Sequence, residues 1–219
     1  MGKLVNLLNK YPKTKRNTED RSLNKTDHHR NIARKFGKEF FDGEREFGYG
    51  GFDYNPKFWT EVVKDFVNYW KLKPGNKVLD VGCAKGFMVY DLIKNFPQIS
   101  CQGVDISEYA IENSLKEVKD FLKVANANDL PFEDNSFDAV ISINTIHNLD
   151  EINCEKALKE IERVSKKYSF ITVDAYTNEI EKKRMFDWNL TAKTIMSDKE
   201  WIKFFEKANY TGDYYWFIP

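Results

Sequence analysis

The stretch Lys77–Asp91 reads KVLDVGCAKGFMVYD, and the rest of the chain can be interpreted around it. Its apolar start follows Pro74–Gly75 and has no helical spacing, which is typical of a fully buried parallel strand. Gly82 and Gly86 then turn the chain, and apolar residues recur with helical spacing until Pro97. A strand, a glycine turn and a helix N-terminus together predict a nucleotide or anion site, because backbone N–H groups point outward there.

Two classes of ligand compete for such a turn. Counted from Gly82, the dinucleotide fingerprint GxGxxG has Ala84 at its second glycine and Phe87 at its third, so it does not match. The pattern Asp80-x-Gly82-x-Ala84-x-Gly86 resembles instead DxGxGxG, the first motif of class I S-adenosylmethionine-dependent methyltransferases, with one alanine in place of glycine. That methyl group is expected to hold the loop slightly further from the ligand. A turn that binds nothing is the alternative.

Composition and charge restrict the function. The chain has 219 residues, 42% of them hydrophobic and 15% aromatic, which predicts one folded domain with a substantial core. The formal net charge is zero, so there is no global electrostatic case for nucleic acid or membrane. Residues 1–40 nevertheless hold 11 Lys and Arg against 4 Asp and Glu. Such a basic arm can bind a polyanion, or it can be a solvated segment.

Cysteine and histidine placement gives no metal site. Cys83, Cys101 and Cys154 are scattered without Cys-x-x-Cys spacing, which favours a reducing compartment and no structural zinc. His28–His29 lies in the polar arm without partners at ligand spacing. The first residues have too short an apolar run for a signal peptide or a membrane span, and Asn6 stands where myristoylation needs Ser or Thr. We expect a soluble, cytoplasmic protein.

A second strand, expected over Ser100–Ile106, ends in an acid. Asp105 follows Gly82 by 23 residues, close to the roughly 20 that separate a ribose-binding carboxylate from such a turn. A carboxylate at the end of a strand can accept hydrogen bonds from both ribose hydroxyls. It could instead cap the next helix, expected over Ser107–Lys119, although Ser107 can also serve as that cap.

Two further strands are expected over Phe121–Ala125 and Phe137–Ser142. The run between them, ANANDLPFEDNSFDAVIS from residue 125, resembles the adenine-side motif of the methyltransferase superfamily. Asn126 stands where that motif usually has Asp, and its amide oxygen can equally accept the adenine amino group. The resemblance covers residues 56–175.

This resemblance implies an α/β fold, Rossmann-like, with an open, twisted, mostly parallel sheet and helices on both faces. It implies S-adenosylmethionine as cofactor and S-adenosylhomocysteine as product, with in-line methyl transfer in which alignment contributes about 7–11 kcal/mol. We divide the chain into an arm and lid (1–55) and a cofactor-binding domain (56–219). The cofactor contacts implied by the motifs are Asp80, Gly82, Cys83, Ala84, Lys85, Gly86, Asp105, Ile106, Asn126, Ala127 and Asn144.

The loop after the fourth strand should face the reacting centre, because ligands in open α/β sheets lie beyond the carboxyl ends of strands. His147 is the candidate general base there, since imidazole titrates near neutrality. It could instead be a polar loop residue at the start of a helix, expected over Asp150–Lys167. Asn144 is not followed by the Pro-Pro-aromatic run of amino-group methylases of nucleic acids, which argues against base methylation. The expected substrate contacts are Asp174 and Tyr176, at the end of a strand over Ser169–Ala175, and Arg45, Tyr49 and Tyr54 in the arm.

The arm around residues 47–54, FGYGGFDY, is too rich in glycine for a helix interior and too aromatic for an idle linker. It predicts a lid that offers π-faces to a sulfonium or a substrate, or else an extension that packs on the core. Near the other end, an apolar strand over Tyr214–Ile218 needs a partner. Either Leu190–Met196 provides it or another subunit covers the edge, as in a homodimer.

We therefore expect a methyltransferase for a small-molecule acceptor, by O- or N-methylation. The arm has a looser resemblance to methyltransferases of bacterial surface-polysaccharide (capsule) gene clusters, which would make the acceptor a sugar, a nucleotide-linked compound or a phosphoramidate intermediate. Two alternatives are an RNA methyltransferase that uses the basic arm and an S-adenosylmethionine-binding protein without turnover. Of these, nucleic acid is the less favoured partner.

Overall fold

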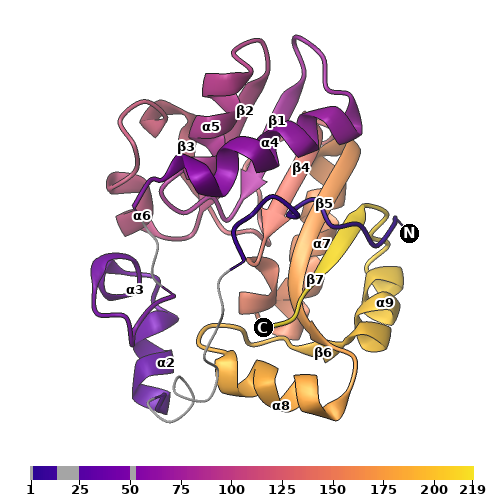
Figure 1. The fold of residues 1–219 in the computed structure, drawn as a ribbon. Coiled ribbons are helices and arrows are strands. Elements are labelled where there is room, and N and C mark those ends of the chain that lie inside the picture. Colours follow the sequence, from indigo (N-terminus) through magenta and orange to yellow (C-terminus); the bar gives the residue numbers. More distant parts are fainter. Residues whose placement is uncertain (1, 14–24, 50–52) are drawn as a thin grey trace.

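A computed structural model describes residues 2–13, 25–49 and 53–219, and its centre is a parallel sheet (Figure 1). The strands run in the order β3-β2-β1-β4-β5-β6, and β7 also pairs with β5. All pairs of named strands are parallel. The fold class expected from the sequence is therefore confirmed. The strands are β1 (Lys77–Val81), β2 (Ser100–Asp105), β3 (Leu122–Val124), β4 (Phe137–Ile143), β5 (Ser165–Tyr176), β6 (Met196–Ser197) and β7 (Asp213–Phe217).

Helices cover both faces of the sheet, because alternate strand residues point to opposite faces. One apolar cluster joins the sheet to α4 (Pro56–Trp70) and α5 (Phe87–Asn95). The other joins it to α7 (Glu151–Val164) and α9 (Asp198–Lys207). The continuous apolar runs in the strands follow from this burial on both sides. Among the described helices, none has the length and apolar character that a bilayer crossing requires.

The outer edge of β7 is covered by the beginning of the same chain. Residues 3–13, which we call the N-terminal strap, run along β7 and then across α4 (Figure 1). The Val5 N–H donates to the Tyr214 carbonyl at 3.0 Å, and the Tyr214 N–H donates to the Lys3 carbonyl at 3.1 Å. The expectation that Leu190–Met196 fills this place is wrong. Of that segment only its last residue enters a strand, in the two-residue parallel pairing of β6 with the end of β5.

Two helices are shorter than the sequence predicts. The helix expected over Ser107–Lys119 is only α6 (Glu108–Glu112), since the Asn113 and Ser114 side chains bond to backbone carbonyls of the preceding turn and so compete with helix continuation. A short 3-10 turn, η1 (Lys119–Phe121), leads into β3. Likewise α7 ends at Val164 rather than at Lys167, because β5 already begins with the next residue.

The described part of the arm contributes two short helices, α2 (Asp27–Ala33) and α3 (Lys38–Asp42). They lie beyond the carboxyl ends of the strands, on the side of α6 and α8 (Glu179–Trp188) (Figure 1). Part of the glycine-aromatic stretch, residues 50–52, lies outside the described residues. Asn55 caps α4, as expected, by accepting the Lys57 N–H at 3.1 Å. The division of the chain at this point into arm and domain stays a prediction.

Candidate active site

A cavity of about 1980 Å³ opens at the carboxyl ends of the strands. Its floor is formed by the residues that follow β1, β2 and β4, and its opposite wall by the arm helices and by the loop of residues 189–194. Most of the residues implied by the motifs are brought together here. Those that line the cavity are Asp80, Gly82, Cys83, Ala84, Asp105, Ile106, Asn126, Ala127, Asn144, His147, Asp174, Arg45 and Tyr49.

The glycine turn requires glycine at Gly82 for two reasons. Its φ is +87°, and a Cβ at this position would lie 2.0 Å from Thr145 Oγ1. The N–H groups of Gly82 and Cys83 donate to the Val104 carbonyl at 2.7 and 3.0 Å. These N–H groups therefore do not point outward, contrary to the sequence expectation. A turn whose donors are used internally suits a cationic ligand group better than a pyrophosphate.

Ala84, the departure from the methyltransferase motif, has a left-handed backbone with φ +50°. Its N–H donates to Asp105 Oδ2 at 2.8 Å. Its side chain packs against the apolar cluster of the arm, which includes Phe36 and Phe40. The extra methyl group is thus in contact with the arm.

Two buried acids lie beside this turn. Burial, and next the nearby charge of Asp105, raise the pKa of Asp80 to about 8. Burial also raises the pKa of Asp105, although the N–H groups of Ser107 and Ala84 oppose that rise. Ser107, not Asp105, caps α6, because its hydroxyl accepts the Ala110 N–H at 3.0 Å. The capping alternative for Asp105 is thereby removed, and its role with ribose stays a prediction.

Lys85 and Gly86 do not line the cavity in the part of the chain that the structure describes. The Lys85 ammonium lies 2.5 Å from Asp42 Oδ1 of α3, and the side chain is 8% exposed. A Cβ on Gly86 would meet Leu122 at 2.7 Å. Lys85 therefore connects the turn to the arm, and Gly86 lets the turn pack on β3.

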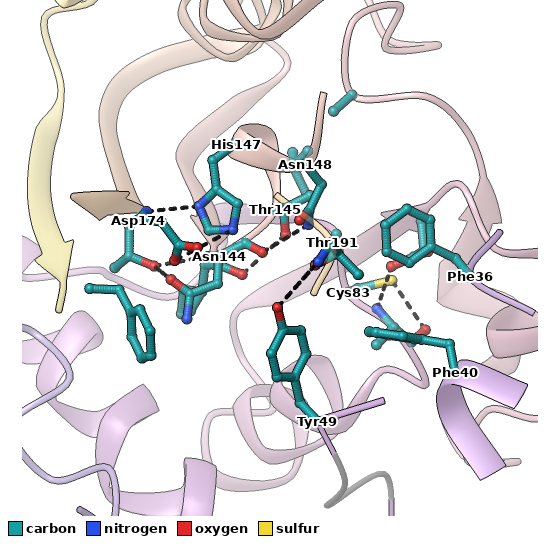
Figure 2. A pocket seen from close by; sticks show the side chains of 18 of the residues that line it. Phe36, Phe40, Tyr49, Cys83, Asn144, Thr145, His147, Asn148, Asp174 and Thr191 are labelled. Carbon is teal, nitrogen blue, oxygen red and sulfur yellow. Dashed lines mark hydrogen bonds and ion pairs between the residues drawn. The ribbon is translucent and has the colours of Figure 1, made fainter. Parts of the chain in front are cut away.

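His147 and Asp174 form a buried pair at the end of β4 and β5 (Figure 2). His147 lies in a 3-10 turn, η2 (Ile146–Asn148). Its Nδ1 accepts the backbone N–H of Asp174 at 2.9 Å, so the neutral ring carries its proton on Nε2. That nitrogen lies 3.7 Å from Asp174 Oδ1. Burial lowers the pKa of His147, and this outweighs the opposing charge of Asp174.

Asn144 lies between this pair and the glycine turn (Figure 2). Its φ is +52°, and its Oδ1 accepts the Thr172 hydroxyl at 2.7 Å. Nearby, Oδ1 of Asn148 is buried without a hydrogen-bond partner among the described residues. The end of β4 therefore presents amide groups to the cavity.

Two expected substrate contacts are placed elsewhere. The Tyr54 hydroxyl donates to Asp91 Oδ1 at 2.9 Å, on α5, and the Tyr176 hydroxyl is 3.5 Å from Glu200. Neither is among the described residues that line the cavity. Tyr49 does line it, and its hydroxyl accepts the Leu190 N–H at 3.0 Å (Figure 2).

Several cavity residues were not anticipated from the sequence. Phe36 and Phe40 of the arm were seen only as part of its aromatic content. The loop of residues 189–194 carries no motif, and only its buried polar residues Asn189, Thr191 and Thr194 distinguish it in the structure. Such a loop is positioned by tertiary hydrogen bonds, which a local pattern does not reveal.

Residues 72–210 match the family model described as a methyltransferase domain. The chain belongs to this methyltransferase family. Its first motif, adenine-side motif and sheet are those of the class I S-adenosylmethionine-dependent domain expected from the sequence.

Three relatives illustrate the range of proteins to which this methyltransferase domain is similar. An uncharacterized protein of Methanocaldococcus jannaschii is 37% identical over 173 residues, covering 74% of this chain and 70% of that protein. Demethylmenaquinone methyltransferase of Symbiobacterium thermophilum is 36% identical over 116 residues, 49% of this chain and 45% of that protein. Phosphoethanolamine N-methyltransferase 3 of Arabidopsis thaliana is 36% identical over 97 residues, 42% of this chain and 19% of that protein. The chain spans less than half the length of the last two relatives.

Solved structures share the fold of this methyltransferase domain. The YcgJ protein of Bacillus subtilis has a TM-score of 0.54 at 19% identity, over 67% of this chain and 66% of that one. An S-adenosylmethionine-dependent methyltransferase of Methanosarcina mazei has a TM-score of 0.52 at 20% identity, over 65% of this chain and 82% of that one.

The cavity residues of the methyltransferase domain fit S-adenosylmethionine. Asp80 is a buried acid with a raised pKa, which a cationic amino-acid end would neutralise. Gly82 leaves room for close approach, and Asp105 stands at the end of the next strand. Ile106, half exposed at 51%, offers an apolar surface beside Asn126 for a flat base.

Proposed function

We propose that this protein transfers a methyl group from S-adenosylmethionine to a small-molecule acceptor. The observation that carries the proposal is the continuity of the cavity. One space joins the cofactor-binding ends of β1 and β2 to the His147–Asp174 pair and to the arm. A protein that only binds the cofactor would need no room beyond it, so this extent supports turnover.

The bound cofactor would supply an electrophilic methyl carbon on a sulfonium. An acceptor lone pair attacks that carbon, the carbon–sulfur bond breaks, and the acceptor loses a proton. Residues Asp80, Gly82 and Asp105 would hold the cofactor, while Ile106 and Asn126 flank its base. Alignment and exclusion of water carry most of the rate.

The hydrogen bonding changes the roles that we propose at the end of β5. The Nδ1 lone pair of His147 is already used by the Asp174 N–H, so a substrate proton cannot reach it without breaking that bond. Asp174 lines the same cavity and is the better proton acceptor, with His147 as the residue that positions it. This arrangement reverses the two roles expected from the sequence.

The acceptor is proposed only by class. A sugar, a nucleotide-linked compound or a phosphoramidate intermediate of capsule biosynthesis follows from the looser resemblance of the arm. The named relatives act on demethylmenaquinone and phosphoethanolamine, which widens the set to test.

A radiolabelled methyl-transfer screen over these classes and over RNA tests the proposal. Asp105→Asn should weaken S-adenosylhomocysteine binding about 10- to 100-fold, since hydrogen bonds to charged groups contribute about 1.5–3 kcal/mol. Asp120→Asn, an exposed carboxylate outside the cavity, should leave binding unchanged. Transfer to RNA alone, or binding without any transfer, would contradict the proposal.

A further inference from the structure

The arm side of the cavity carries positive charge that no carboxylate of the described chain neutralises. Six Lys and Arg residues line the cavity and form no ion pair among the described residues, unlike Lys85 or Arg163. The acids of the cavity lie elsewhere: three follow the strands, and Glu46 faces His29 at 3.6 Å. The six are Lys13, Arg34, Lys35, Arg45, Arg184 and Lys193.

Arg34 is the best fixed of these cations. At the end of α2, its Nε donates to the Thr191 carbonyl at 3.3 Å and its Nη2 to the Ala192 carbonyl at 3.2 Å. A guanidinium has five N–H donors in a rigid fork, so these two bonds orient the group and leave further donors for a ligand. The bonds to neutral carbonyls do not cancel its charge.

Lys193 follows these carbonyls directly and connects them to the reacting centre. Its backbone N–H donates to the His147 carbonyl at 3.0 Å, and the Thr194 N–H donates to the same oxygen at 2.9 Å. Its side chain is exposed and lines the cavity together with Arg34. A ligand held by these two cations therefore lies one loop away from the His147–Asp174 pair.

We propose that the methyl acceptor carries a phosphate group, and that Arg34 and Lys193 bind this group. The inference rests on the proposed function and names its substrate class. A dianionic phosphate matches a cavity wall with six cations better than a singly charged carboxylate does. The proton-accepting carboxylate then lies at the opposite end of the molecule, so the atom to be methylated is separated from the phosphate.

The test uses the full chain saturated with S-adenosylhomocysteine and titrated with phenyl phosphate or benzoate in a calorimeter. Phenyl phosphate should bind, at least tenfold more tightly than benzoate, and its affinity should fall as salt rises. Arg34→Gln and Lys193→Gln should each weaken phenyl phosphate binding at least tenfold. Lys203→Gln, an exposed cation outside the cavity, is the matched control and should change nothing.

Arg34→Gln can also loosen the loop that it supports, so Lys193→Gln is the decisive variant because no side-chain bond of Lys193 is recorded in the described chain. S-adenosylhomocysteine affinity should be the same in every variant. If cofactor binding fails in the parent protein, the proposed function fails. If the cofactor binds but phenyl phosphate binds no better than benzoate, or Lys193→Gln binds it normally, the phosphate site alone is overturned. Tighter binding of an RNA oligomer than of phenyl phosphate, lost in both variants, would overturn it in favour of a polynucleotide.

Discussion

The Lys85 ammonium of the glycine turn donates to Asp42 Oδ1 at the end of α3, over 2.5 Å. The other oxygen of Asp42 accepts the Tyr109 hydroxyl of α6 at 2.8 Å. Burial raises the pKa of Asp42, but the hydrogen bonds from Lys85 and Tyr109 outweigh this and hold it below the ordinary value. One carboxylate of the arm thus fastens the arm to the two elements that follow β1 and β2.

Breaking this pair should loosen both the arm and the turn. We expect Lys85→Met or Asp42→Asn alone to lower the free energy of unfolding by about 2 kcal/mol, because each leaves a partly buried group without its partner. The double variant should lose less than the sum, with a coupling of about 1–2 kcal/mol in urea unfolding. Additive losses would show that the two residues do not act as a pair.

The raised pKa of Asp80 predicts a pH-dependent affinity for the cofactor. With a pKa of about 8, the carboxyl is protonated at pH 6, and burial disfavours its charge. A cationic ligand group beside it favours ionisation, so binding should release a proton and affinity should rise from pH 6 to about 8. Calorimetry in buffers of different ionisation enthalpy measures this release, and Asp80→Asn should abolish it.

The same shift predicts the stability of the ligand-free protein. An unfolded Asp ionises near pH ~3.9, whereas folded Asp80 holds its proton up to about 8. The folded state therefore binds more protons between these values, and this residue makes stability fall as pH rises through that window. Asp80→Asn should flatten the slope in urea midpoints between pH 5 and 8. An unchanged slope would contradict the raised pKa.

Substitution at His147 separates positioning from proton transfer. In His147→Asn the amide oxygen can take the place of Nδ1 and accept the Asp174 N–H, whereas His147→Ala removes that acceptor. If His147 only positions Asp174, the Asn variant keeps most of its kcat and the Ala variant does not. Asp174→Asn should lose about 10²–10⁴ in kcat for a hydroxyl acceptor. Equal losses in His147→Asn and His147→Ala would instead restore His147 as the base.

A proline in the strap tests its role at the sheet edge. Val5→Pro removes the N–H that bonds to Tyr214, and should lower the free energy of unfolding by about 1–2 kcal/mol and promote self-association through β7. Leu4→Pro is the matched control, because the recorded pairing uses the Lys3 carbonyl and the Val5 N–H. Light scattering and urea unfolding measure both effects. Equal behaviour of the two variants would argue against the pairing.

The sequence predicted the strands and the cofactor side well, because local patterns determine both. The apolar run before Gly82 and the acid at Asp105 are such patterns, and both residues line the cavity. It did not predict the direction of Lys85, because only the folded arm brings Asp42 within reach. Nor could it show that Nδ1 of His147 is occupied, since the donor belongs to the backbone of a strand 27 residues away. Long-range hydrogen bonds account for most of what the patterns missed.

The pairing of the strap with β7 has a consequence for synthesis on the ribosome. Val5 emerges early, but its partner Tyr214 is translated near the other end of the chain. At about 5–20 residues per second, the apolar strap waits roughly 10–40 s without its partner strand. Because Leu4 and Leu8 of the strap also line the cavity, the nascent protein holds an incomplete binding chamber until its final strand is in place.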